Sequence, residues 1–188
     1  MNNFESLGLS NKLLRAVESQ GYTTPTPVQV QAIPPLLDGR DVLGVAQTGT
    51  GKTAAFGLPI MNHLLKVGSK PAPKTVRGLI LAPTRELAGQ IKDNLLSYSQ
   101  GTHIKVNLVV GGLAIKAQIN RLARGTDLLI ATPGRLIDLI DRQAVDLSFT
   151  QFLVLDEADQ MLDLGFIHAL RRIAPLLAPE RQTMLFSA

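Results

Sequence analysis

The fold of this chain follows from the stretch Val42-Leu43-Gly44-Val45-Ala46-Gln47-Thr48-Gly49-Thr50-Gly51-Lys52-Thr53. An apolar run leads into a glycine-containing turn and then into a Lys-Thr pair where a helix would begin. Backbone N–H groups of such a loop converge on phosphate oxygens; Lys52 adds positive charge, and the Thr53 hydroxyl can ligate Mg²⁺. Ala46 stands where this pattern usually has glycine, so it is expected in an ordinary backbone region. The stretch predicts a strand, a polyphosphate-binding loop and a helix.

Apolar runs and helical patterns alternate after this stretch. The runs suit buried parallel strands, expected at residues 42–46, 78–82, 106–110, 128–131, 152–155 and 183–186. The patterns between them suit helices, expected at residues 53–66, 85–99, 114–124, 135–142 and 167–177. This order predicts an α/β fold with a doubly wound, mainly parallel sheet that is covered by helices on both faces.

Two short helices are expected before the first strand. Ser10 can cap the first of them, and Gly21 ends it. Thr26 can cap the second, whose first residue is Pro27, a position where a missing N–H costs nothing. This second helix is expected to stop at residues 38–39.

Composition limits the class of protein. The chain has 188 residues, 45% of them hydrophobic and 18% charged, as in ordinary soluble globular domains. No apolar run approaches the roughly 18 residues of a membrane span, and the start does not resemble a signal peptide, so a cytoplasmic protein without membrane contact is expected. The absence of cysteine excludes disulfides and cysteine-ligated zinc. A net charge of +4 permits an anionic partner.

Polar clusters directly follow five of the expected strands. They are residues 46–53, Pro83-Thr84-Arg85-Glu86-Leu87, Gly111-Gly112, Thr132-Pro133-Gly134-Arg135 and Asp156-Glu157-Ala158-Asp159. In an open parallel sheet the carboxyl ends of the strands meet at one edge, and ligands bind there. Each cluster alone also fits a turn or a helix cap. Side by side with a phosphate loop, they predict a composite site.

Asp156 and Glu157 follow the apolar run 152–155. Acids at a helix N-terminus also interact favourably with the helix dipole, which is the structural alternative. A phosphate loop, however, needs an acidic partner for its metal. Asp156 is expected to hold Mg²⁺, partly through water, and Glu157 to orient and deprotonate the water that attacks a γ-phosphate. Lys52, Asp156 and Glu157 are therefore the predicted catalytic residues.

These motifs, in this order, resemble the first RecA-like domain of the DEAD-box RNA helicases over residues 4–188. The sequence Asp156-Glu157-Ala158-Asp159 and Ala46 at the head of the phosphate loop are forms that this family uses. The resemblance implies a RecA-like P-loop NTPase fold that binds ATP and Mg²⁺. It also implies a short helical Q-motif segment, residues 1–30, before an ATP-binding domain, residues 31–188, within one compact unit.

The resemblance assigns an ATP site. Residues 21–29 are similar to the Q motif, which selects adenine, and the Gln29 amide has the donor and acceptor that match adenine N6 and N7. Tyr22 offers a ring for the base, and Phe4 matches an upstream aromatic of the family; core packing is the alternative for both. The implied ATP-binding residues are Phe4, Tyr22, Thr24, Gln29, Gln47, Thr48, Gly49, Thr50, Gly51, Lys52 and Thr53, with Thr53 and Asp156 as Mg²⁺ ligands.

The resemblance also assigns an RNA site. The implied contacts are Pro83, Thr84, Arg85, Gly111, Gly112, Thr132, Pro133, Gly134 and Arg135. Helix-start amides, threonine hydroxyls and guanidinium groups suit the sugar–phosphate backbone, so binding is expected to be independent of sequence and sensitive to salt. Asp159 and Ser187 resemble the pair that couples the nucleotide site to strand separation.

The resemblance stops at Ser187-Ala188, where the family's third motif continues with threonine. The family's second RecA-like domain, whose arginines complete the ATP site, has no counterpart in this sequence. We therefore expect a monomeric fragment that binds nucleotide weakly, hydrolyses ATP poorly and is no helicase alone, while its parent unwinds RNA duplexes. The open alternatives are a DNA helicase, another P-loop NTPase such as a kinase, and a non-catalytic RNA- or protein-binding module.

Overall fold

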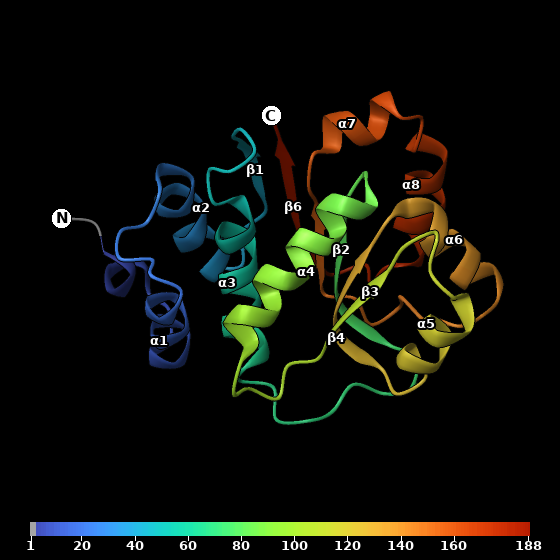
Figure 1. The fold of residues 1–188 in the computed structure, drawn as a ribbon, viewed down its shortest axis with the longest axis horizontal. Helices are drawn as coiled ribbons and strands as arrows, with labels where there is room; N and C mark the ends of the chain where they lie inside the picture. Colours follow the sequence, from blue (N-terminus) through green and yellow to red (C-terminus); the bar gives the residue numbers. More distant parts are fainter. Residues whose placement is uncertain (1–2) are drawn as a thin grey trace.

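A computed structural model describes residues 3–188, which form one six-stranded sheet with helices on both faces (Figure 1). The strand order is β1-β6-β5-β2-β4-β3, and all neighbouring strands are parallel. The strands are β1 (Val42–Val45), β2 (Val76–Leu81), β3 (Val106–Val109), β4 (Thr126–Ala131), β5 (Phe152–Leu155) and β6 (Gln182–Ser187). The predicted α/β fold with a doubly wound parallel sheet is confirmed.

Separate helical layers cover the two faces of the sheet except at β1, which was expected to be buried but, as an edge strand, leaves Leu43 and Val45 72% and 76% exposed. Along the central strand β2, Ile80 packs into one hydrophobic cluster, whereas Leu79 and Leu81 pack into the other. The first cluster holds α1 (Asn11–Ser19), α2 (Pro27–Leu37), α3 (Lys52–Leu64) and α4 (Arg85–Ser99), and the second holds α5 (Ile115–Leu122), α6 (Pro133–Asp141), α7 (Ala158–Asp163) and α8 (Ile167–Ile173). Each fully buried aliphatic side chain contributes about 1.5–3 kcal/mol to this packing.

The two helices before the sheet begin at the expected residues, but the hydroxyl groups of Ser10 and Thr26 do not cap them as expected. Ser10 precedes α1 and Thr26 precedes α2, yet neither hydroxyl has a hydrogen-bond partner within residues 3–188. The Ser10 N–H instead donates to Asn62 Oδ1 of α3 (2.9 Å), which fixes the start of α1 against the phosphate-loop helix. The Thr26 N–H donates to Gln29 Oε1 (3.0 Å), the reciprocal half of a capping box.

The main differences from the sequence prediction are short elements and the starts of two strands, since β2 and β4 each begin two residues earlier than expected. The 3₁₀ helices Phe4–Leu7 and Ala174–Leu176 and the helix α7 were not expected as separate elements. Strand β2 begins two residues before Gly78. A glycine inside a strand normally weakens that strand. A Cβ at Gly78 would lie 2.7 Å from Leu128 Cδ2, so glycine permits the close approach of β4 at this point.

No helix within residues 3–188 is both long and apolar enough to cross a membrane.

Candidate functional site

The loops after the strands meet at the carboxyl edge of the sheet and form two neighbouring hollows. One is a cavity of about 330 Å³ around the phosphate loop, and the other is a more open cleft of about 450 Å³ beside the loops after β2 and β4. Among the predicted ATP-site residues, the cavity is lined by Tyr22, Thr24, Gln29, Thr48, Gly49, Gly51, Lys52, Thr53, Asp156 and Glu157. The structure therefore brings most of the predicted nucleotide site together.

The phosphate loop depends on glycine at two positions. Gly49 and Gly51 have φ angles of +84° and +90°, in the left-handed region that side chains disfavour. A Cβ at Gly51 would also lie 2.4 Å from Gln29 Nε2. Ala46 continues the sheet ladder, its N–H donating to the Ser187 carbonyl (2.9 Å), which agrees with its expected ordinary backbone.

Lys52 and Asp156 form a buried pair at the floor of the cavity. Their Nζ and Oδ1 atoms are 3.6 Å apart, and the residues are 6% and 2% exposed. The Lys52 ammonium has no hydrogen-bond acceptor within residues 3–188, although it carries three donors. Burial raises the pKa of the Asp156 carboxyl; Lys52 opposes that rise and Glu157 adds to it. A buried ammonium with unused donors is suited to an anion such as a phosphate.

Glu157 is held beside the phosphate loop in an unusual conformation. Its φ of +54° and ψ of +53° are left-handed, which costs a residue other than glycine about 1–3 kcal/mol. The Thr48 hydroxyl donates to Glu157 Oε1 (2.9 Å), and the Glu157 N–H donates to Asp156 Oδ1 (3.1 Å). The carboxylate of Glu157 is therefore aimed at the loop that precedes α3.

Gln29 joins the predicted Q-motif segment to the phosphate loop. Its Oε1 accepts from the Thr26 N–H (3.0 Å), and its Nε2 donates to the Gly51 carbonyl (3.1 Å), while the residue is 5% exposed. One amide N–H and one oxygen lone pair remain free for a ligand. The sequence suggested a role in base selection but gave no sign of this internal bridge.

The aromatic residues of the predicted ATP site lie in different surroundings. Tyr22 is 48% exposed and lines the cavity, whereas Phe4 is 6% exposed and packs in the core. Phe4 therefore packs in the core, which was the alternative to a role in the ATP site, and it does not line the cavity. Gln47 and Thr50 do not line it either; the Thr50 hydroxyl donates to the Gln47 carbonyl (2.6 Å).

Helix α4 supplies a wall of the cavity that sequence reasoning missed. Gln90, Asn94 and Tyr98, four residues apart on one helix face, line the cavity. Burial raises the pKa of the Tyr98 phenol, and the nearby Tyr22 phenol adds to the rise. The four-residue spacing of these polar side chains could have indicated a cavity wall, but the same spacing equally fits a solvent-exposed helix face.

The open cleft collects most of the predicted RNA-binding residues. It is lined by Pro83, Thr84, Arg85, Gly111, Thr132, Gly134 and Arg135, together with Glu86, Asp138 and Phe166, which were not predicted. Gly112 and Pro133 do not line it. Gly112 nevertheless lies beside it, because a Cβ there would be 2.2 Å from Arg85 Nη1.

The two arginines of the cleft hold the loop after β3. Arg85 Nη1 donates to the Gly111 carbonyl (3.4 Å), and Arg135 Nη1 donates to the Leu113 carbonyl (3.0 Å). Thr84 caps α4, its hydroxyl accepting from the Leu87 N–H (3.2 Å). The cleft thus presents two cations and two helix N-termini, those of α4 and α6, in a preformed arrangement.

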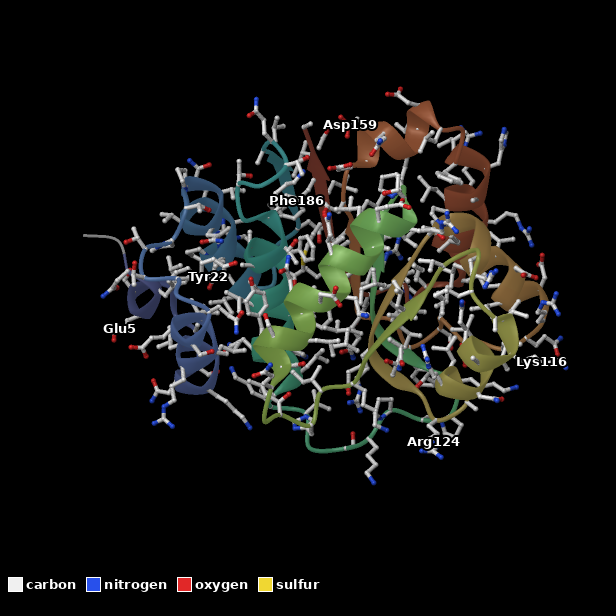
Figure 2. The ribbon with its side chains drawn as sticks, in the orientation of Figure 1. Glu5, Tyr22, Lys116, Arg124, Asp159 and Phe186 are labelled. Carbon is white, nitrogen blue, oxygen red and sulfur yellow. The ribbon has the colours of Figure 1, made fainter. Side chains whose placement is uncertain are left out.

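Asp159 and Ser187, the predicted coupling pair, lie next to each other. Desolvation is the largest single effect on the pKa of the Asp159 carboxyl and raises it, but the Ser187 hydroxyl and several backbone N–H groups, including that of Ala188, together lower the pKa overall. Figure 2 shows Asp159 on the side of the molecule where α7 approaches the end of β6.

The fold is that of a RecA-like domain. The sequence model of the DEAD/DEAH box helicase family matches residues 26–188, and the chain belongs to that family. The chain is 45% identical over 185 residues to an ATP-dependent RNA helicase CshA of Limosilactobacillus reuteri, covering 98% of this chain and 36% of the relative. A crystal structure of a DEAD box protein from the hyperthermophile Methanococcus jannaschii matches all of this chain and 50% of that chain, with a TM-score of 0.90 and 35% identity. The chain therefore spans about a third of the curated relative and half of the solved protein.

Proposed function

We propose that this chain is the ATP-binding and partial RNA-binding half of an ATP-dependent RNA helicase that locally unwinds RNA duplexes. The observation that carries the proposal is the buried Lys52 ammonium, which has no hydrogen-bond acceptor within residues 3–188 and lies between the phosphate loop and two acids. A nucleotide polyphosphate supplies the missing acceptors. Family membership and the match to an ATP-dependent RNA helicase support the same reading.

In this proposal each side chain of the cavity has a separate task. Backbone N–H groups of the loop and Lys52 bind the outer phosphates of ATP. The Thr53 hydroxyl and the Asp156 carboxylate are oxygen donors that line the cavity, so they fit Mg²⁺, which offsets phosphate charge. Glu157 accepts a proton from the attacking water; the Thr48 hydroxyl engages only its Oε1, so Oε2 can serve as the acceptor.

The adenine end of the site uses the Q-motif segment. Gln29 contacts the base with its remaining N–H and lone pair, and the exposed ring of Tyr22 stacks on it. Thr24 lines the same part of the cavity. For Phe4 we propose only a packing role beneath this segment, since it is buried in the core.

The open cleft is proposed to grip the backbone of one RNA strand. Its exposed helix N-termini, Thr132 and the arginines suit phosphate oxygens, and none of these groups is arranged to read a base. Asp159 and Ser187 are proposed to connect strand separation to the nucleotide site, because they join the end of β6 to the helix that follows Glu157.

The proposal is tested with Glu157→Gln in the full-length parent. RNA-stimulated ATP hydrolysis should fall by about 10²–10⁴-fold, the usual contribution of a general base, while ATP and RNA binding persist. Glu18→Gln, at an exposed position of α1, is the matched control and should hydrolyse ATP normally. Normal hydrolysis in the Glu157→Gln enzyme would exclude Glu157 as the base.

The isolated chain should bind adenine nucleotides weakly and hydrolyse ATP poorly, because a second RecA-like domain in cis is proposed to complete both sites. Titration with a fluorescent ADP and a steady-state ATPase assay measure the two properties. Multiple turnover equal to that of the full-length parent would contradict this proposal.

Two further measurements separate the alternatives. Comparing single-stranded RNA with DNA as activators of the parent's ATPase distinguishes an RNA helicase from a DNA helicase. Failure to bind any nucleotide would instead favour a non-catalytic binding module. The division of the chain after residue 30, the monomeric state and the cytoplasmic location stay predictions.

A further inference from the structure

The edge of the sheet formed by β3 carries a groove that the proposed nucleotide and RNA sites do not use. Strand β3 pairs with β4 on one side and ends the strand order on the other. A groove of about 530 Å³ follows this edge between α4 and α5 (Figure 1). Leu96 of α4 lines one side, Val106 and Asn107 of β3 line the floor, and Arg121 of α5 lines the other side.

The groove is positively charged and its charge is uncompensated. Lys105, Arg121 and Arg124 line it and are exposed, no acidic residue lines it, and none of the three forms an ion pair within residues 3–188. The closest acid in sequence, Asp127, is 1% exposed. It is engaged by Arg77 and by the Lys105 N–H, both at 2.8 Å.

Charges on the neighbouring helix do not alter this balance. Lys92 and Asp93 of α4, which precede Leu96, pair with each other at 3.1 Å. The arginines of the RNA cleft differ, because Arg85 and Arg135 already donate to protein carbonyls. The β3 groove therefore presents cations that are free to meet an anionic ligand.

The floor of the groove identifies the kind of anionic ligand. The Lys105 carbonyl accepts from the Leu128 N–H (2.9 Å) and the Val109 carbonyl from the Thr132 N–H (3.2 Å), so the odd-numbered residues face β4. Backbone groups alternate sides along a strand, so those of Val106 and Leu108 face the free edge and offer both donors and acceptors. An extended peptide matches both kinds of group. A phosphate backbone offers only acceptors, and it would meet the carbonyls unfavourably.

We propose that the β3 groove binds an extended acidic peptide segment of a partner protein, which adds a strand to the sheet at β3. The acidic side chains pair with Arg121, Arg124 and Lys105, and apolar side chains on the alternate positions contact Leu96. The groove lies near the amino end of β3, whereas the proposed ATP and RNA loops follow the carboxyl ends of strands. Arg124 and Asp159 accordingly lie on opposite sides of the molecule in Figure 2. Peptide and nucleotide can therefore bind at the same time.

The test uses a fluorescein-labelled alternating Val-Glu peptide of about eight residues, a typical strand length, and fluorescence anisotropy with the whole chain. We expect saturable binding that weakens as salt rises, and no binding of the matching Val-Lys peptide. Replacing both Arg121, in the last turn of α5, and Arg124, just after that helix (Arg121→Gln with Arg124→Gln), should weaken binding by about fivefold or more. The control Lys12→Gln with Arg15→Gln removes the same charge from exposed positions of α1 and should leave binding unchanged.

A second arm tests strand addition itself. The same peptide N-methylated along its backbone keeps its charges but lacks N–H donors, so its affinity should be lost. The Val106 and Leu108 amides should exchange their hydrogens more slowly when the unmodified peptide is bound.

Three outcomes would overturn the proposal. Equal binding of the N-methylated peptide would show non-specific electrostatic attraction instead of strand pairing. A single-stranded oligouridylate whose affinity falls in the Arg121/Arg124 double variant, and which the Val-Glu peptide does not displace, would make the groove a nucleic-acid surface. Absence of saturable Val-Glu binding up to about 1 mM would exclude a peptide site of useful affinity.

Discussion

The cavity around the phosphate loop and the open cleft lie at the same edge of the sheet, but the surroundings of their charged side chains differ. In the cavity, Lys52 and Asp156 are 6% and 2% exposed, and the ammonium of Lys52 has no hydrogen-bond acceptor within residues 3–188. In the cleft, Arg85 and Arg135 already donate to the carbonyls of Gly111 and Leu113. A buried charged group whose hydrogen-bond donors are unused gives a large gain when a ligand supplies acceptors. A less buried group that already donates to protein carbonyls, as Arg85 and Arg135 do, gives a smaller gain.

Helix α4 belongs to both regions. Its first turn, with Thr84 and Arg85, lines the cleft, and its later turns, at Gln90, Asn94 and Tyr98, line the cavity. At about 1.5 Å per residue, the face from Gln90 to Tyr98 spans about 12 Å. The two sites therefore share one rigid wall, while they differ in the burial of their cations.

The largest difference between the regions should come from Lys52→Met. Hydrogen bonds from a charged group contribute about 1.5–3 kcal/mol, so the affinity for a fluorescent ADP should fall by about 10- to 150-fold. Arg85→Met removes a cation of similar size from the cleft and should leave the affinity for ADP within a few-fold of wild type. Titration measures the affinity for ADP, and urea unfolding of each variant checks that the fold is kept. Equal losses of ADP affinity in the two variants would contradict the difference between the cavity and the cleft.

A smaller effect is expected from Arg135→Gln on binding of single-stranded RNA. Loss of one phosphate contact should reduce the slope of log affinity against log salt by about 0.7 and lower the affinity by a few-fold. Arg171→Gln, at an exposed position of α8 away from the cleft lining, is the matched control. An unchanged slope in the Arg135→Gln chain would remove Arg135 from the RNA contacts.

The buried Asp156 carboxyl should make the free energy of unfolding fall as pH rises through its raised pKa. Burial raises the pKa of Asp156 above its ordinary value of 3.8, so the folded state favours the protonated carboxyl. This contribution is present below the ordinary pKa and is lost as pH rises through the raised value. The free energy of unfolding of Asp156→Asn minus that of wild type should therefore increase as pH rises from about 3.8. Urea titrations across the acidic range measure it, and a decrease would contradict the raised pKa.

The smallest effect is expected from Thr48→Val, which keeps the shape of the side chain and removes its bond to Glu157 Oε1. The bond ties the phosphate loop to Glu157, so its loss should change nucleotide affinity by about twofold, the value of a weak hydrogen bond of about 0.5 kcal/mol. We expect the change to be an increase, measured by titration with fluorescent ADP. A loss of affinity would show that Thr48 itself contacts the nucleotide.

The sequence was sufficient for the long periodic elements and for the clustering of loops. Helix α4 has the predicted limits, residues 85–99, because Thr84 caps it and its apolar spacing is regular. The polar clusters came together because parallel strands bring their carboxyl ends to one edge. Such features depend on local sequence patterns, so they can be predicted before the fold is known.

Features that depend on contacts far apart in sequence could not be predicted. The bridge from Gln29 to the Gly51 carbonyl spans 22 residues, and the bond from Thr48 to Glu157 spans 109. The burial of Phe4 away from the cavity and the left-handed backbone of Glu157 likewise arise from tertiary packing. Helix α7 was missed because its six residues are too short for a helical period to show.

The pairing of β1 with β6 has a consequence for synthesis of the protein. β1, which leads into the phosphate loop, has β6 as its neighbour in the sheet, and the bond from the Thr183 N–H to Asp41 Oδ1 joins residues 142 apart. At about 5–20 residues per second, a ribosome needs about 7–30 s between the two strands. During that interval the apolar β1 has no partner strand, so the phosphate loop of the nascent chain is not yet held by the sheet. Folding of this loop is therefore timed by the last strand to be made, and chaperone binding to β1 should concentrate in that window.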